Sequence, residues 1–348
     1  MVREAVVAVP GDLATPTGGF SYDRRIIAEL AAIGWKIDVI NLGGGFPRPT
    51  ELTRAEAAKQ LAGLSRQCPI VVDGLAFGVL PETAALLRES HCLVALVHHP
   101  LALETGLSAG ESARLHASEQ AALACARHAI ATSATTQRIL VTDFHVAPER
   151  LSVAEPGTDK PVIARRTRER EVALLSVGAV VPRKGYDVLV AALAKIAHLP
   201  WRLVIVGDCS RSLETVLRLR ADIASHGLEG RIVFHGVVTR EELASLYARS
   251  DVFVLPSRFE GYGMACTEAI AHGVPVVSTT AGALVETVPA GSGILVPPDD
   301  AGAVADALQH LIEQPQERER LAACARAATF PSWREQGARF ARVLEALA

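Results

Sequence analysis

Two glutamates and three glycines stand close together in the segment Ser257–Val277, SRFEGYGMACTEAIAHGVPVV. The apolar run 252–255 before it predicts a buried strand, whereas the apolar positions after Gly263 recur at helical spacing. The segment therefore predicts a strand, a loop that contains Glu260, and a helix that begins near Gly263 and contains Glu268. A helix amino terminus offers unpaired N–H groups to an anion, and glycine lets the anion approach the backbone, so this place suits a phosphate.

Carboxylates beside a phosphate site make sense if the ligand also carries hydroxyl groups, because carboxylates accept hydrogen bonds from sugar hydroxyls. A nucleotide sugar carries two sets of hydroxyl groups, one on the ribose and one on the transferred sugar. Glu268 would then bind the ribose and Glu260 the transferred sugar, while the amides between them bind the diphosphate. The other interpretation is that both acids are solvated residues near a helix start, where acids are common.

The same segment resembles the family-4 retaining glycosyltransferases, whose hallmark is two glutamates separated by seven residues. Glu260 and Glu268 have this spacing, and the preceding Pro-Ser and following Gly-Val-Pro-Val-Val extend the similarity. The resemblance implies an α/β protein of the GT-B fold, with two Rossmann-like, doubly wound domains facing a central cleft. It is dense over residues 174–333 and thinner before residue 160.

The chain length of 348 residues predicts two domains, because one hydrophobic core rarely spans so many residues. We expect an N-terminal, acceptor-side Rossmann-like domain over residues 1–162 and a C-terminal, nucleotide-sugar-binding Rossmann-like domain over residues 171–330. The resemblance implies that the helix within 331–348 returns to the N-terminal domain. The charged stretch 160–171 is interpreted as an exposed linker, with a basic patch that touches a membrane as the alternative.

The first 42 residues predict a strand at 5–10, a helix at 22–34 and a strand at 36–42, which is a parallel unit. Parallel sheets bind ligands beyond the carboxyl ends of their strands, where the loop carrying Gly18 and Gly19 would lie. A tight turn before a helix also explains these glycines. The resemblance implies that they lie next to the transferred sugar and acceptor.

A later strand, predicted at 93–97, ends in His98 and His99. A single histidine at such a position is often structural or solvated, and two adjacent ones point to opposite faces of a strand, which argues against a shared metal. The resemblance implies that His98 contacts the donor sugar. His99 stands where the family commonly has an aspartate.

The loop 178–185, after a predicted strand at 172–177, contains Arg183 and Lys184. Two cations there could neutralise a diphosphate leaving group, and they match the family's basic pair. Near 282–286 the family has two glycines, of which Ala283 replaces the second. The predicted catalytic residues are Glu260, Arg183, Lys184 and His98. The predicted donor-binding residues are Glu268, Gly18, Gly19, Gly261, Tyr262, Gly263, Met264, Ala265, Gly178, Gly207 and Val237.

The composition gives no case for nucleic acid as a partner, since 35 Lys and Arg nearly balance 38 Asp and Glu. No apolar stretch approaches the roughly 18 residues of a transmembrane segment, and the first residues have too short an apolar core for a signal peptide. We therefore expect a cytoplasmic protein. The six cysteines form no CxxC pair, so neither a disulfide framework nor a zinc site is expected.

The residues and the resemblance together predict a hexosyltransferase that moves a sugar from a nucleotide-diphosphate sugar to a small-molecule, glycan or lipid-linked acceptor, without a cofactor. The resemblance implies that the reaction is retaining. Because no Asp-x-Asp triplet is present, we expect no metal site, and the basic pair and helix amides would stabilise the leaving group. A GT-B phosphorylase or a sugar-nucleotide epimerase would use the same cradle. A noncatalytic sugar-nucleotide-binding protein is the less favoured alternative. A nicotinamide-dependent oxidoreductase is disfavoured because no GxGxxG opens either half.

Overall fold

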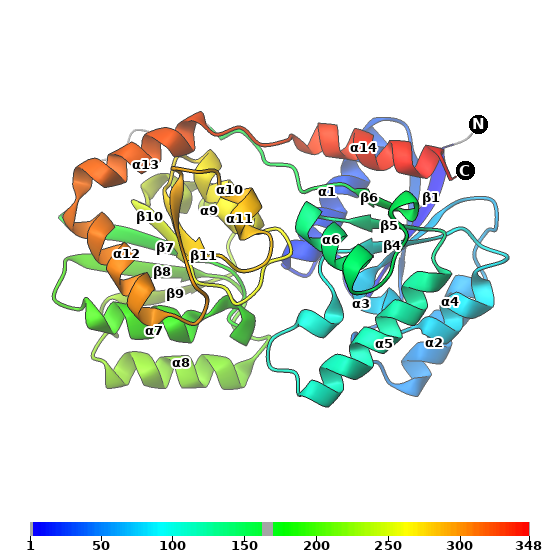
Figure 1. Cartoon of the computed structure of the whole chain (residues 1–348), viewed down its shortest axis with the longest axis horizontal. Coiled ribbons are helices and arrows are strands. Elements are labelled where there is room, and N and C mark those ends of the chain that lie inside the picture. Colours follow the sequence, from blue (N-terminus) through cyan, green and yellow to red (C-terminus); the bar gives the residue numbers. More distant parts are fainter. Residues whose placement is uncertain (1–2, 162–169, 348) are drawn as a thin grey trace. The chain divides into compact units, whose positions relative to one another are not determined.

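The computed structural model describes residues 3–161 and 170–347, which divide into two compact units (Figure 1). The first unit is Met1–Gly157 with Pro331–Ala348, and the second is Thr158–Phe330. Each contains one six-stranded sheet whose pairings are all parallel, so the predicted doubly wound α/β architecture is confirmed. The greater part of the predicted linker, residues 162–169 with Arg165, Arg166 and Arg168, lies outside the described residues.

The sheet of the first unit has the order β2-β1-β3-β4-β5-β6. Its strands are β1 (Glu4–Val9), β2 (Lys36–Asn41), β3 (Ile70–Asp73), β4 (Leu93–Val97), β5 (His128–Ala131) and β6 (Leu151–Val153). Its helices are α1 (Gly18–Ala32), α2 (Glu51–Ala62), α3 (Gly74–Phe77), α4 (Pro81–Leu87), α5 (Ala109–Cys125), α6 (Ala134–Thr142) and α14 (Trp333–Glu345). Strands β3 and β4 are buried at every position, which explains their unbroken apolar sequences.

The second unit repeats this design, with the strand order β12-β11-β10-β7-β8-β9. Its strands are β7 (Val172–Val177), β8 (Trp201–Val206), β9 (Ile232–Gly236), β10 (Val252–Leu255), β11 (Val276–Thr279) and β12 (Gly293–Val296). Its helices are α7 (Tyr186–Lys195), α8 (Leu213–Ser225), α9 (Arg240–Arg249), α10 (Met264–Ala271), α11 (Leu284–Thr287), α12 (Ala301–Glu313) and α13 (Pro315–Ala327). Strand β10 at its centre is fully buried.

Each sheet has one point where the strand order reverses, between β1 and β3 in the first unit and between β7 and β10 in the second. Ligands of open parallel sheets bind beyond the carboxyl ends of the strands at such a point, because the connections on either side diverge there and leave a crevice. The loop before α1 and the loops after β7 and β10 are therefore the places to look for a site.

Helix α14 belongs to the first unit although it follows the second unit in the chain. The Trp333 ring lies 5.0 Å from the Arg25 guanidinium and 5.9 Å from the Tyr22 ring, both on α1. Gly337 faces Glu29 of α1 so closely that a Cβ at this glycine would lie 2.4 Å from the Cβ of Glu29. The two helices pack with backbones in close approach, which the missing side chain permits.

Helix α1 begins four residues earlier than the sequence predicted, so Gly18 and Gly19 form its first turn rather than the end of a loop. The hydroxyl of Thr17 caps the helix by accepting a 3.1 Å hydrogen bond from the Phe20 N–H. The prediction missed this start because glycine is a poor helix former, whereas a capped first turn tolerates it. Across the described residues, every helix is too short or too polar to cross a bilayer.

Candidate active site

The predicted site residues of the second unit gather at the carboxyl edge of its sheet. Gly178 and Gly207 follow β7 and β8, Val237 follows β9, and Glu260, Gly261 and Tyr262 lie in the loop after β10. Gly263 precedes α10, and Met264, Ala265 and Glu268 lie on that helix. Arg183 and Lys184 lie in the short 3-10 turn Pro182–Lys184. The expected helix start near Gly263 is confirmed.

Glu260 is the centre of this group and is buried, with 6% of its surface exposed. The Lys184 Nζ lies 2.6 Å from its Oε1, and the Arg183 Nη1 lies 3.7 Å from its Oε2. The Ser257 hydroxyl donates a 2.6 Å hydrogen bond to Oε1. The acid and the two cations that the sequence assigned to different parts of one ligand therefore contact one another directly.

The charge state of Glu260 follows from these partners. Burial alone would raise the pKa of the carboxyl group, but the charges of Lys184 and Arg183 outweigh it and lower the pKa to about 2. Glu260 is thus ionised throughout the physiological range and can only accept hydrogen bonds. Its remaining acceptor positions suit hydroxyl donors.

A second side chain of the loop, Arg258, fixes the basic turn and was not singled out from the sequence. Its Nη1 donates a 2.6 Å hydrogen bond to the Pro182 carbonyl, and its backbone N–H donates to the Arg183 carbonyl at 2.8 Å. Its guanidinium also pairs with Asp187 at 2.7 Å and Asp299 at 2.6 Å. The position of the cations is therefore set by backbone contacts as well as by Glu260.

The loop before α11 closes against Glu260 from the other side. Gly282 has φ +62°, and a Cβ there would lie 2.2 Å from the Glu260 carbonyl oxygen, so only glycine fits. Ala283 has φ −79° and donates its N–H to the same carbonyl at 2.9 Å. This explains how the chain accommodates alanine where the family pattern has a second glycine.

Helix α10 carries the second glutamate away from the ion cluster. The Glu268 Oε2 lies 3.1 Å from the hydroxyl of buried Tyr247, which also lies 3.2 Å from the Ala265 carbonyl. The N–H groups of Met264 and Ala265 are at the amino end of the helix, where no intrahelical acceptor exists for them. An anion beside Gly263 would meet these amides.

Two residues predicted to bind the donor, Tyr262 and Val237, differ in how exposed they are. The Tyr262 side chain is buried, with 7% exposed, and the Tyr262 carbonyl accepts a 2.8 Å hydrogen bond from Thr287. Little of the Tyr262 side chain is therefore accessible to a ligand. Val237 has 55% of its surface exposed at the end of β9, so this residue is accessible to a ligand.

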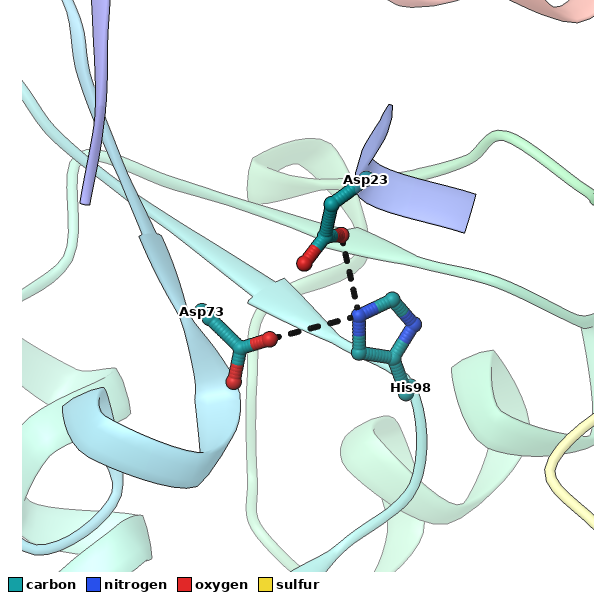
Figure 2. Close-up of side chains that lie close together, drawn as sticks. All are labelled: Asp23, Asp73 and His98. Atoms are coloured by element: carbon teal, nitrogen blue, oxygen red, sulfur yellow. Dashed lines mark ion pairs between the residues drawn. The ribbon is translucent and has the colours of Figure 1, made fainter. Parts of the chain in front are cut away.

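In the first unit, His98 follows β4, and two carboxylates face the same nitrogen of its ring, as Figure 2 shows. Its Nε2 is 3.2 Å from Asp23 Oδ1 and 3.5 Å from Asp73 Oδ2. Asp23 lies on α1 and Asp73 ends β3, so the cluster occupies the reversal point of this sheet. A Cβ at Gly19 would lie 3.3 Å from the imidazole, which brings this predicted glycine next to the predicted histidine.

The two aspartates change the titration of the histidine. Burial alone would lower the pKa of His98, but the two carboxylates, Asp23 foremost, raise it to about 10, so the ring is an imidazolium at neutral pH. Burial in turn raises the pKa of Asp23 to about 6, although the charge of His98 opposes this. The ligand atoms of the three side chains lie within 4.8 Å of one another, a spacing that would also admit a cation.

The sequence contained only part of the signal for this cluster. Asp73 closes a strand that the apolar pattern predicts, and a carboxylate at the carboxyl end of a parallel strand is a candidate site residue. Asp23 stands inside an amphipathic helix, where an acid is ordinarily a solvent-facing residue. Its burial, with 2% exposed, follows from the packing of α1.

The chain has close relatives among known proteins. The family model "Glycosyl transferases group 1" matches residues 161–328. An "MMP alpha-(1->4)-mannosyltransferase" of Mycolicibacterium hassiacum is 30% identical over 323 residues, which are 86% of this chain and 76% of that protein. A "D-inositol 3-phosphate glycosyltransferase" of Xylanimonas cellulosilytica is 35% identical over 230 residues, 61% of this chain and 54% of that protein.

Solved structures share the whole architecture. A sucrose-phosphate synthase from Thermosynechococcus elongatus superposes with a TM-score of 0.83 at 24% identity and covers 99% of both chains. The Anabaena HepE structure in complex with UDP-glucose has a TM-score of 0.79 at 19% identity and covers 98% of this chain and 99% of that one. These matches confirm the predicted GT-B fold.

Proposed function

Since this chain belongs to the group 1 glycosyltransferases, we propose that it is a retaining, family-4-type enzyme that moves a hexose from a nucleotide-diphosphate sugar to a hydroxyl acceptor. The observation that carries the proposal is the buried cluster of Lys184, Arg183 and Glu260 beside the amino end of α10. Cations and helix amides suit a diphosphate, and an ionised carboxylate suits sugar hydroxyls. A nucleotide-diphosphate sugar is the ligand class that uses both the cations with the helix amides and the ionised carboxylate.

Each residue has a role in this proposal. Lys184 and Arg183 offset the charge that develops on the departing diphosphate, together with the N–H groups at the start of α10. Glu260 accepts hydrogen bonds from the transferred sugar, and Glu268 from the ribose. Val237 lies beside the base. In the first unit, His98 and the Gly18-Gly19 turn would contact the donor sugar.

The retaining course requires that the new bond forms on the face from which the diphosphate leaves. The glycosidic C–O bond to the diphosphate breaks through an oxocarbenium-like state, and the acceptor oxygen bonds to the anomeric carbon. The acceptor's proton passes to the departing phosphate oxygen. Because Lys184 and Arg183 are already positioned, they need no reorganisation as this charge develops.

The donor is to be identified by ligand stabilisation of the full chain. The matched proteins point to hexoses, since one is named a mannosyltransferase and another was solved with UDP-glucose. We therefore expect one of UDP-glucose, GDP-mannose or ADP-glucose to raise the melting temperature. At 100 times the dissociation constant a ligand stabilises by about 2.7 kcal/mol, which a thermal melt resolves. Absence of a shift with every nucleotide sugar would contradict the proposal.

The two glutamates separate binding from catalysis. Glu268→Gln should weaken the donor and its free nucleoside diphosphate by similar factors, about 1–2 kcal/mol, because the ribose does not react. Glu260→Gln should leave diphosphate affinity nearly unchanged and lower turnover. Isothermal titration and steady-state kinetics on both variants measure these effects. The opposite pattern would reverse the two assignments.

Metal independence is a separate expectation of this proposal. Transfer should survive exhaustive EDTA treatment, because the positive charge at the leaving group comes from Lys184 and Arg183 rather than from a cation. The measurement is the initial rate of transfer before and after chelation. A loss of activity that Mn²⁺ or Mg²⁺ restores would exclude the proposed role of the basic pair.

A further inference from the structure

Asp23 is a buried carboxylate with an unusual environment. It is 2% exposed, and neither of its oxygens accepts a hydrogen bond from any described residue. Its close polar neighbours among them are the imidazole of His98, whose Nε2 lies 3.2 Å from Oδ1, and the carboxylate of Asp73, within 4.8 Å of the same group. A carboxylate kept from water is costly unless a nearby charge compensates it, and the His98 ring at 3.2 Å is the group that can do so.

The orientation of the His98 ring decides which of its nitrogens faces the carboxylates. Nε2 faces Asp23 and Asp73, whereas Nδ1 points away from both carboxylates (Figure 2). The imidazole is 20% exposed, and its edge packs at 81° against the Tyr22 ring, 5.3 Å away. The backbone carbonyl of His98 accepts a 3.2 Å hydrogen bond from the Thr132 hydroxyl. Ring and backbone are therefore both fixed.

We propose that Asp23, aided by Asp73, is a positioning residue that holds the His98 imidazolium by Nε2, so that Nδ1–H is presented to the ligand as a hydrogen-bond donor. The ligand atom that it meets must then be an acceptor, such as a sugar hydroxyl oxygen. The contact with a sugar rests on the proposed function, whereas the protonation and orientation of the His98 ring do not.

The charged state is essential to this role. A neutral imidazole keeps one N–H, and the charges of the two carboxylates beside Nε2 favour that nitrogen for the remaining proton. When the imidazolium loses a proton, it is therefore the one on Nδ1. The ligand-facing nitrogen then changes from a hydrogen-bond donor to an acceptor. Among the described residues, the titratable side chains that contact the ring are Asp23, Asp73 and Tyr22. Burial raises the pKa of the Tyr22 hydroxyl well above its ordinary value, so Tyr22 stays neutral.

The first test follows the His98 ring by NMR and needs no substrate. The full chain is labelled with ¹³C,¹⁵N-histidine, and the His98 signal is assigned with His98→Gln. We expect the wild-type ring to remain protonated from pH 6 to pH 9. Asp23→Asn and Asp73→Asn are near-isosteric changes, and each should bring the titration into this range. If the wild-type ring titrates near its ordinary pKa of about 6.5, the proposal is wrong.

A matched control uses the neighbouring histidine. His99 Nε2 pairs with Glu104 at 3.4 Å, so Glu104→Gln also removes a carboxylate beside an imidazole. It should leave the His98 titration unchanged. Addition of ZnCl₂ to the wild type tests a cation at the same place. Saturable loss of the proton from Nε2 at equimolar Zn²⁺ would replace the proposal with a metal site.

The second test measures turnover with the donor found by thermal shift. For the wild type we expect kcat to be flat from pH 6 to pH 8.5. For Asp23→Asn we expect kcat to fall at least tenfold over the same interval as Nδ1 loses its proton. An equal loss at all pH values would mean a merely structural role for Asp23. If the NMR result holds and no donor is found, the ring is held as proposed and the proposed function is at fault.

Discussion

At the scale of single residues, the charges of the candidate active site are arranged so that each compensates another. Lys184 and Glu260 are both largely buried and lie 2.6 Å apart. Removing Lys184 leaves the buried charge of Glu260 with Arg183 alone, 3.7 Å away, which is more costly than removing both Lys184 and Glu260. A substitution at Lys184 therefore changes the folding free energy and the chemistry together, and kinetics alone does not separate them.

A double-mutant cycle separates them. Lys184→Met should destabilise the protein by about 3–5 kcal/mol and lower turnover at saturating donor by about a hundredfold or more. Adding Glu260→Gln should restore most of the stability and none of the turnover. Urea unfolding and steady-state kinetics on the four proteins measure both quantities. Strictly additive losses of stability would mean that the two side chains do not interact.

The pH dependence of stability from this pair has a definite sign. The pKa of Glu260 is lowered in the folded chain to about 2 from an ordinary 4.5. Its contribution is therefore fully present above pH 4.5 and is lost as the pH falls through about 2.

The raised pKa of His98, about 10 against an ordinary 6.5, changes the folding free energy in the opposite direction. Its contribution is present below pH 6.5 and is lost as the pH rises through about 10.

Residues that act through a local motif could be predicted from the sequence, and those brought together by packing could not. Glu260 and Glu268 are eight positions apart on one strand-loop-helix unit, and their spacing identifies them. Asp23 and Asp73 lie fifty positions apart on different elements. Their proximity depends on the order of the strands in the sheet, which apolar periodicity does not specify.

At the scale of elements, the loop between β11 and α11 acts as a backbone support for the loop that carries Glu260. Its contact is made by main-chain atoms, since the Glu260 carbonyl accepts the N–H of Ala283. The sequence analysis noted the glycine and the alanine at 282–283 but not this contact, because main-chain pairing between loops leaves no residue-type pattern.

Two neighbouring substitutions test this support. Gly282→Ala puts a Cβ into the Glu260 carbonyl at a positive φ, so we expect a loss of more than about 2 kcal/mol in stability and weaker nucleoside diphosphate binding. Ala283→Gly keeps the N–H donor and should cost about 1 kcal/mol, with affinity nearly unchanged. Thermal unfolding and calorimetric titration check both. Equal effects would show that the conformation of Gly282 is not critical.

At the scale of the whole molecule, the last helix stabilises the unit that is built from the first residues. The contact between Gly337 and Glu29 joins α14 to α1 at the level of their backbones. The chain length and the resemblance both predicted two domains. The return of the last helix came from a resemblance, because nothing in its amphipathic pattern says which partner it covers.

Gly337→Ala should disturb the first unit selectively. The added Cβ meets the root of the Glu29 side chain, so α14 must shift, at a cost of about 1–3 kcal/mol. In hydrogen–deuterium exchange we expect faster exchange in α1 and unchanged exchange in α12. Gly110→Ala, in α5, is the control, since a Cβ there meets no described atom within 4 Å. Faster exchange in both helices would refute a local effect.

The chain leaves the first unit after Gly157 and re-enters it at Pro331, so the second unit is an insertion in sequence terms. The two crossing segments meet at one point, where a Cβ at Gly157 would lie 2.2 Å from the Trp333 backbone nitrogen. Exchange of the second unit with that of a relative therefore requires two splice points whose ends already lie side by side. Recombination at this point would replace the whole second unit and leave the first unit intact.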